Sequence, residues 1–239
     1  DDNTLLMWQR QDDGTQRTSA DAGTYCSSLS FGGHSDWRLP EAYEFHSIVD
    51  YRSYQAGNSS PFIDTTYFPS TQSTYYWSSS MYRNRDTTSY NLQFTNGTLS
   101  YANTTNSYYV RCVRGTSTTR SFTDNSDSTV NDTKTGLVWQ QTSSSKMTWE
   151  SALTSCEGLT LGSQSDWRLP NIKELGSIVD VSDYNPTIDN TAFPSTYGDE
   201  YWSSSPASSN DRYGINFKYG SIFIEPLSMT YYVRCVRGG

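Results

Sequence analysis

The stretch SDWRLP at Ser35–Pro40 returns at Ser165–Pro170, and YYVRCVRG at Tyr108–Gly115 returns at Tyr231–Gly238. Shorter motifs recur between them in the same order: SIVD at 47–50 and 177–180, FPST at 68–71 and 193–196, and YWSSS at 76–80 and 201–205. A repeat of this domain-sized length indicates tandem domains and not a solenoid of small units. We therefore predict two copies of one domain, spanning residues 1–115 and 116–239.

The four cysteines follow the same repeat, with Cys26 matching Cys156 and Cys112 matching Cys235. Four cysteines allow three pairings, and two independently folding copies favour Cys26–Cys112 and Cys156–Cys235. The alternative is four buried free thiols, whereas no CxxC motif or histidine cluster favours a metal site. Disulfides indicate an oxidising compartment, so we predict a secreted protein, extracellular or on a cell surface.

Composition narrows the classes of partner. The net charge is −8 and the pI about 4.7, which argues against nucleic acid held by bulk electrostatics. Hydrophobic residues make up 34% but aromatic residues 15%, so aromatic rings are expected to build much of the core. No apolar run reaches the length of a membrane span. The sequence opens at Asp1-Asp2 without a signal peptide, which we interpret as a mature, processed form.

Local patterns predict an α+β fold in each copy. Strands are expected at Leu5–Gln9 and Leu137–Gln140, and an amphipathic helix at Trp149–Glu157, with Thr148 as N-cap and Gly158 ending it. A second helix should follow each WRLP motif.

In the second copy that helix has the spacing of a capping box, with Asn171 followed by Glu174. A hairpin is expected around Asn96-Gly97. The last strand should alternate, with Val110, Cys112 and Arg114 on one side and Arg111 and Val113 on the other.

The series W-Q, WRLP, S-I-V-D, F-P, Y-W-S-S-S and V-R-C-V-R-G resembles a bacterial domain family first described at the C-terminus of the collagen-like adhesin of Legionella. The resemblance covers nearly the whole chain twice. It implies a bacterial surface protein, and in the adhesin the domain is associated with sulfated glycans. A fainter similarity reaches the formylglycine-generating enzymes and C-type lectins. That similarity implies two tandem C-type-lectin-like domains, each with two helices, short antiparallel strands and one disulfide.

No catalytic set is repeated in both copies. His34 and His46 align with Gln164 and Gly176, so neither histidine belongs to a duplicated site. The formylglycine-generating enzymes need reactive cysteines, whereas the four cysteines here are expected to be structural. We therefore predict no enzymatic activity, no cofactor and no metal.

The DWR triplets at 36–38 and 166–168 have two interpretations. The tryptophan could be a platform for a sugar ring, or it could be buried while Asp and Arg fix the turn before the helix. The second interpretation is favoured. Four arginines near the ends of the copies are expected to pair with carboxylates and not to bind an anion: Arg111, Arg114, Arg234 and Arg237.

Tyr, Ser, Asn and Thr are abundant between Trp77 and Val110 and between Trp202 and Val233, where the copies differ most. Antibody loops use this mixture for recognition. Five residues are therefore candidate contacts to a ligand or another subunit: Tyr82, Tyr90, Tyr101, Tyr213 and Tyr219. Four asparagines begin N-x-S/T triplets and are candidate glycosylation sites, with O-linked sugars as the alternative: Asn58, Asn96, Asn103 and Asn131.

The segment SFTDNSDSTVND at 121–132 precedes only the second copy. It predicts a strand, a turn and a second strand, with Phe122 and Val130 as apolar anchors. Its three aspartates suggest a calcium loop, but a polar turn explains them equally well. In the first copy only Asp1–Thr4 precede Leu5. The first copy would then present an unpaired strand edge. The alternatives are that this edge is frayed or that the native N-terminus lies before Asp1.

Two functions follow from these patterns. The first is a non-enzymatic structural or adhesive protein that polymerises head-to-tail, as a homo-oligomer or helical polymer. The second is a monomeric lectin-like module that binds a glycan or a surface protein.

Overall fold

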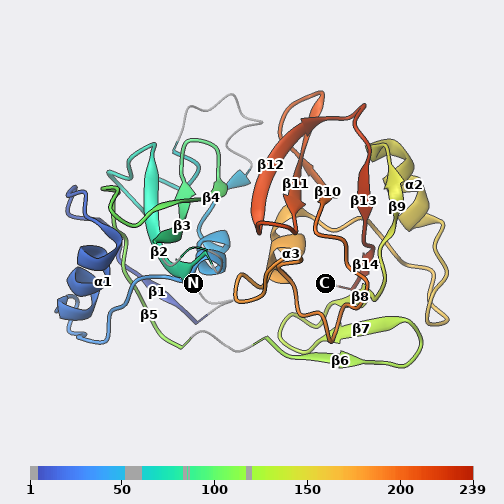
Figure 1. Cartoon of the computed structure of the whole chain (residues 1–239), viewed down its shortest axis with the longest axis horizontal. Coiled ribbons are helices and arrows are strands. Elements are labelled where there is room, and N and C mark those ends of the chain that lie inside the picture. The colour runs from blue at the N-terminus through green and yellow to red at the C-terminus, as the bar shows by residue number, and fades with distance from the viewer. Residues whose placement is uncertain (1–4, 52–60, 83–84, 86, 117–119, 239) are drawn as a thin grey trace. The chain divides into compact units, whose positions relative to one another are not determined.

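The computed structural model describes residues 5–51, 61–82, 85, 87–116 and 120–238 (Figure 1). The chain divides into two compact units, Asp1–Ser117 and Thr118–Gly239, called unit 1 and unit 2 below. The disulfides Cys26–Cys112 and Cys156–Cys235 each lie within one unit, with Cα–Cα separations of 5.5 Å. These bonds confirm the predicted pairing, one disulfide per repeat.

Unit 1 is mostly β-structure. Its elements, in chain order, are β1 (Met7–Trp8), α1 (Ser19–Ser28), the 3-10 helix η1 (Ala42–Ser47), β2 (Tyr75–Met81), β3 (Thr88–Gln93), β4 (Thr98–Asn103) and β5 (Val113–Arg114). Strands β2, β3 and β4 form an antiparallel sheet in that order, and β1 pairs with β5. The turn between β3 and β4 contains Asn96 and Gly97, as predicted.

Unit 2 repeats this plan and adds a hairpin before it. Its elements are β6 (Phe122–Asp124), β7 (Thr129–Asp132), β8 (Val138–Gln140), β9 (Ser144–Met147), α2 (Trp149–Glu157), α3 (Ile172–Ser177), β10 (Glu200–Pro206), β11 (Asp211–Asn216), β12 (Ser221–Pro226), β13 (Tyr231–Val233) and β14 (Val236–Arg237). The two sheets have the orders β12-β11-β10-β13-β9 and β14-β8-β7-β6. The predicted strand–turn–strand at 121–132 is therefore confirmed as β6 and β7.

Helix boundaries follow the capping signals. Helix α2 spans the predicted residues and ends at Gly158. Helix α3 has the predicted capping box: the Asn171 side chain accepts from the Glu174 N–H at 2.9 Å, and the Glu174 carboxylate accepts from the Asn171 N–H at 2.8 Å. Within the described ranges, no helix is long and apolar enough to cross a membrane.

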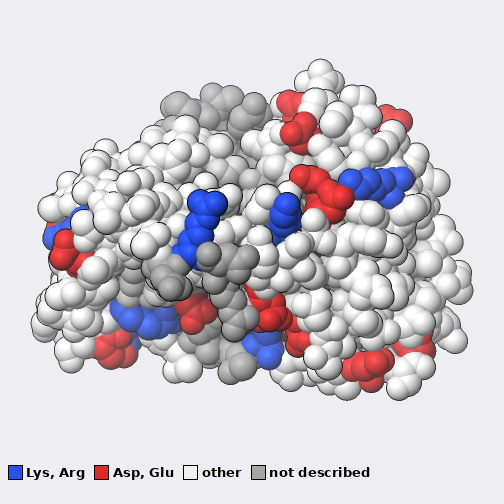
Figure 2. All heavy atoms as spheres, in the orientation of Figure 1, with Lys and Arg blue, Asp and Glu red and all other residues white. Residues whose placement is uncertain are grey.

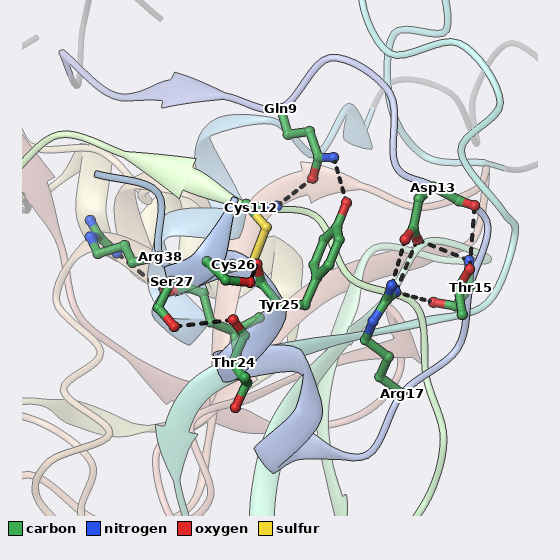
Figure 3. The surroundings of a disulfide bond; sticks show 12 residues. Gln9, Asp13, Thr15, Arg17, Thr24, Tyr25, Cys26, Ser27, Arg38 and Cys112 are labelled. Atoms are coloured by element: carbon green, nitrogen blue, oxygen red, sulfur yellow. Dashed lines mark hydrogen bonds and ion pairs between the residues drawn. A yellow bond between two sulfur atoms is a disulfide. The ribbon is translucent and has the colours of Figure 1, made fainter. Parts of the chain in front are cut away.

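The predicted last strand is interrupted: β5 contains only Val113–Arg114, and in unit 2 β13 and β14 are separate strands. Arg111, Cys112 and Val113 are all fully buried, so both sides of this segment face the interior of the unit. The Cys112 N–H donates to the side-chain Oε1 of Gln9 at 3.0 Å (Figure 3), and the equivalent Cys235 N–H donates to a glutamine in the same way. A side chain thus takes the place of a ladder hydrogen bond, and regular pairing is interrupted at each cysteine.

Aromatic side chains fill both cores. Trp77 and Trp202 are completely buried at equivalent positions, beside the disulfide of each unit. Their indole N–H groups donate to the backbone oxygens of Arg17 at 2.8 Å and Met147 at 3.0 Å. Large buried rings explain how a chain with few aliphatic residues forms two cores.

Candidate functional site

A buried arginine anchors the end of unit 1. The Arg111 guanidinium donates to the backbone oxygens of Gln9 at 2.7 Å and Arg10 at 2.8 Å. It also donates to the Asp12 carboxylate at 3.0 Å and to the Thr71 hydroxyl at 2.8 Å. Three of these partners lie in the segment that follows β1, and Thr71 belongs to the FPST motif. Arg111 therefore connects the segment before β5 to both of them. Burial lowers the pKa of Arg111, with Asp12 and Tyr76 acting in the opposite direction.

Unit 2 has the same anchor without the carboxylate. Arg234 is fully buried and donates to the backbone oxygens of Gln140 at 2.9 Å and Gln141 at 2.5 Å, and to the hydroxyls of Ser143 at 3.1 Å and Thr196 at 2.7 Å. Ser143 stands where unit 1 has the aspartate. Burial lowers the pKa of Arg234 to about 10.

The expectation that the four arginines pair with carboxylates is therefore right for three of them. Arg111 pairs with Asp12, and the two exposed pairs at the other positions are Arg114–Asp36 and Arg237–Asp166. The expectation is wrong for Arg234, because the groups that accept from its two terminal nitrogens are neutral backbone oxygens and hydroxyls. All four have internal partners, which argues for structural roles.

In unit 2 the β6–β7 hairpin covers this anchor. Val130 of β7 is paired with Trp139 of β8 and is fully buried. The Phe122 ring of β6 lies edge-on to the buried Phe193 ring, with 5.0 Å between centroids. The Gln141 side chain donates to the carboxylate of Asp124 at 3.1 Å. The hairpin thus covers β8 and the FPST motif together.

The equivalent surface of unit 1 is uncovered in the part of the chain that the structure describes. There β1 pairs only with β5. Phe68, which matches Phe193, is half-buried, and its neighbour Tyr67 is 69% exposed. Leu5 is 78% and Met7 45% exposed, and Arg10, which matches Gln141, is also exposed. We call these five residues the open face of unit 1.

The backbone of unit 1 keeps the conformation of the covered form. Leu5 has a φ of 58°, and Gly136, which stands at the equivalent place at the end of the β7–β8 turn, has a φ of 72°. The left-handed region disfavours a leucine by roughly 1–2 kcal/mol. Unit 1 therefore enters β1 with the geometry that follows a hairpin turn in unit 2.

Three of the five candidate contact tyrosines are not at the surface. Tyr82, Tyr90 and Tyr213 are buried, at 6%, 1% and 0% exposure. Tyr101 is 37% exposed and Tyr219 is half-buried. In unit 1 the rings of Tyr82 and Tyr101 stack at 4.4 Å, so the tyrosines of this sheet mainly pack on one another. A contact role is left as a proposal for Tyr101 and Tyr219.

The candidate glycosylation sites differ in accessibility. Asn103 and Asn131 are exposed, Asn96 is half-buried, and Asn58 lies outside the described residues. The side-chain oxygens of Asn96 and Asn103 each accept from the threonine two residues later, and so they stabilise turns. Attachment of sugar remains a prediction for the exposed pair.

The tryptophans of the DWR triplets are buried, as the favoured interpretation predicts, and do not form a platform for a sugar ring. Trp37 is 4% and Trp167 2% exposed, and their indole N–H groups donate to backbone oxygens of Phe31 and Leu161. Arg38 forms two bonds with the carboxylate of η1, and the equivalent arginine does so with α3. The triplet therefore fixes the start of the second helix.

The aspartates of the hairpin stabilise turns. Asp124 accepts from the Ser126 N–H, and Asp127 accepts from the N–H and hydroxyl of Thr129. Asp132 accepts from the backbone N–H groups of the next turn. These contacts favour the polar-turn interpretation over a calcium loop.

Sequence reasoning missed Gln9, although the repeated W-Q motif carried the signal. Its side chain accepts from Cys112 and donates to the Tyr25 hydroxyl at 3.2 Å (Figure 3). Arg17 lies over the Tyr25 ring at 3.9 Å and forms an ion pair with Asp13. The disulfide of unit 1 is thus held inside a polar and aromatic network.

Charged groups do not form a single-sign surface on the side shown in Figure 2, where isolated spots of both signs lie among uncharged side chains.

The family model of the Lcl C-terminal domain matches residues 1–114 and again 128–237. No curated protein matches the sequence. Two matches that together cover most of the chain show that it belongs to the Lcl C-terminal domain family, as a tandem of two copies, and this family indicates an adhesin-like, non-enzymatic role at a bacterial surface.

Proposed function

We propose that this chain is an extracellular structural or adhesive subunit that assembles head-to-tail into a surface fibre. The observation that carries the proposal is the open face of unit 1, because the same surface is covered by a hairpin in unit 2. Uncovered edges and apolar surface are templates for pairing with another chain. The two internal disulfides fit an extracellular location.

The two units are unequal, and this inequality determines the type of assembly. If unit 1 of one copy docks on unit 2 of the next, the contacting surfaces differ. Contacts of this kind form rings when the rotation closes and helical filaments when it does not. We infer that the rotation does not close, so that a fibre is the product.

A C-type-lectin-like fold is part of the proposal, supported in each unit by a disulfide that joins the first helix to the last strands. The second candidate function is a monomeric lectin-like module. It is favoured by Tyr197, which is 53% exposed and stacks on Tyr232 at 4.4 Å, because such rings bind sugars. A glycan array with the monomeric protein tests this alternative.

Covering the open face is expected to abolish assembly. In the test variant, Asp1–Leu5 are replaced by a copy of Ser121–Gly136, so that β1 follows a hairpin and turn as β8 does. Wild type should form polymers in size-exclusion chromatography and negative-stain microscopy, whereas the capped variant should remain monomeric.

The matched control carries the same insertion, with serine in place of the copied Phe122 and Val130, and it should polymerise like wild type. Polymers that form equally well with the intact cap would contradict the open-face mechanism. A wild type that remains monomeric at high concentration would contradict the fibre itself.

A further inference from the structure

We propose that the partner of the open face is the free edge of β6 in a second copy. The inference rests on the proposed fibre and names its contact. Joining β6 to β1 would give one intermolecular sheet in the order β14-β8-β7-β6-β1-β5, formed by the four-stranded sheet of one copy and the two-stranded sheet of the next. Strand addition of this kind provides affinity through backbone hydrogen bonds.

The backbone of β1 is oriented for this pairing. In unit 2 the Gln140 N–H donates to Cys235 at 2.9 Å on the β14 side, and Trp139 is paired with β7 on the other side. In unit 1 the Gln9 N–H donates to Cys112 at 2.8 Å in the same way. Because hydrogen bonding alternates along a strand, Trp8 turns its backbone groups to the side where unit 2 has β7.

The backbone of β6 is also oriented for pairing with β1. The Asn125 N–H donates to the Thr129 oxygen at 3.1 Å, and the Ser121 oxygen accepts from the Thr133 N–H, directly after β7, at 3.0 Å. The backbone groups of Phe122 and Asp124, which alternate with these, therefore point away from β7. Among the described residues β6 has no neighbour on that side.

The side chains on the two edges are compatible. Trp8 and Phe122 both turn toward the interior of their units, while Met7 and Thr123 lie on the solvent side. Antiparallel pairing would then place ring beside ring on the inner side of the joint sheet. It would also reduce the exposure of the apolar residues on the open face.

Charge favours the same partner. Residues 5–11 contain one basic and no acidic side chain, namely the exposed Arg10. The hairpin at 121–132 contains three aspartates, of which Asp124 and Asp127 are exposed, and the basic residue next to it, Arg120, forms an ion pair with Asp180 at 3.8 Å. Opposite charges on the two edges favour their encounter and oppose pairing of like edges.

Cysteine cross-linking in the full chain tests the contact. Met7→Cys and Thr123→Cys place thiols on the solvent side of the two edges, and the four native cysteines are all in disulfides. Directly opposite residues in a sheet lie close enough for a disulfide. Mixing the two single variants under mild oxidation should give covalent dimers, while each variant alone should give at least about tenfold fewer.

The double variant Met7→Cys/Thr123→Cys should give a ladder of covalent polymers. A double variant that yields only an internally linked monomer would overturn the proposal, because β6 would then pair within its own chain. Wild-type fibres without any cross-link would also overturn it and leave self-assembly intact. Thr105→Cys mixed with Met7→Cys is the control for random oxidation and should give no dimers.

A second pair of variants tests the role of the backbone. Phe122→Pro removes an N–H that points away from β7 and, with Met7 opposite Thr123, faces Trp8, so it should abolish fibres while β6 still pairs with β7. Phe122→Ala loses the same side chain but keeps the N–H, and it should retain fibres at a several-fold higher critical concentration. Equal assembly by the two variants would contradict edge pairing.

Discussion

Removing the disulfide of either unit is expected to lower that unit's free energy of unfolding by about 4–5 kcal/mol, because each bond closes a long loop. The paired substitutions are Cys26→Ala with Cys112→Ala in unit 1, and Cys156→Ala with Cys235→Ala in unit 2. Sequence separations of 86 and 79 residues predict nearly equal entropic losses. Hydrogen exchange followed by mass spectrometry on the full chain assigns the loss to a unit.

The two variants serve as controls for each other. A clear difference between them would have to come from packing and not from loop length, since the half-cystines are buried to the same degree. Loss of less than about 1 kcal/mol in both units would contradict the chain-entropy account. The remaining stability would then come from the aromatic core and the buried arginines.

Much of the fold could be predicted because the repeat supplies two independent observations of each feature. The matching positions of Cys26 and Cys156 determined the pairing, and the capping residues set the limits of α2 and α3. The hairpin at 121–132 was recognisable from its polar turn between apolar anchors. Local chemistry determines these features, so the sequence alone is enough to identify them.

Features that depend on burial were not predictable in the same way. Alternation suggested that Arg111 lies on one side of a regular strand, but the guanidinium is buried and the strand is interrupted. Tyr90 and Tyr213 looked like recognition residues by composition, yet tertiary packing places both in the interior. The open face was predictable only in outline, since its residues become visible by comparison of the two units.

Replacing Asp12 by alanine is expected to destabilise unit 1 by about 3–5 kcal/mol, the range for breaking a buried ion pair from one side. Asp12 Oδ2 accepts from Arg111 at 3.0 Å and from the Tyr76 hydroxyl at 2.7 Å, and both side chains are fully buried. Alanine would leave a buried cation and a buried hydroxyl without this acceptor. Denaturant unfolding, resolved by unit through hydrogen exchange, measures the loss.

Unit 2 provides the matched control, because it already has a serine at the aspartate position. Ser143 accepts from Arg234 at 3.1 Å and lies 2.6 Å from the Tyr201 hydroxyl. Asp12→Ser should therefore restore part of the network and cost only about 1–2 kcal/mol. Ser143→Asp should stabilise unit 2, since it gives Arg234 the carboxylate that Arg111 has.

The order of the three variants separates the two explanations of this site. If the ion pair matters, Asp12→Ala is the least stable, Asp12→Ser lies between it and wild type, and Ser143→Asp exceeds wild type. If only the hydrogen-bond count matters, Asp12→Ser would equal wild type and Ser143→Asp would change nothing. A cost below about 1 kcal/mol for Asp12→Ala would mean that carbonyl and hydroxyl groups satisfy Arg111 as they do Arg234, and that the carboxylate is dispensable.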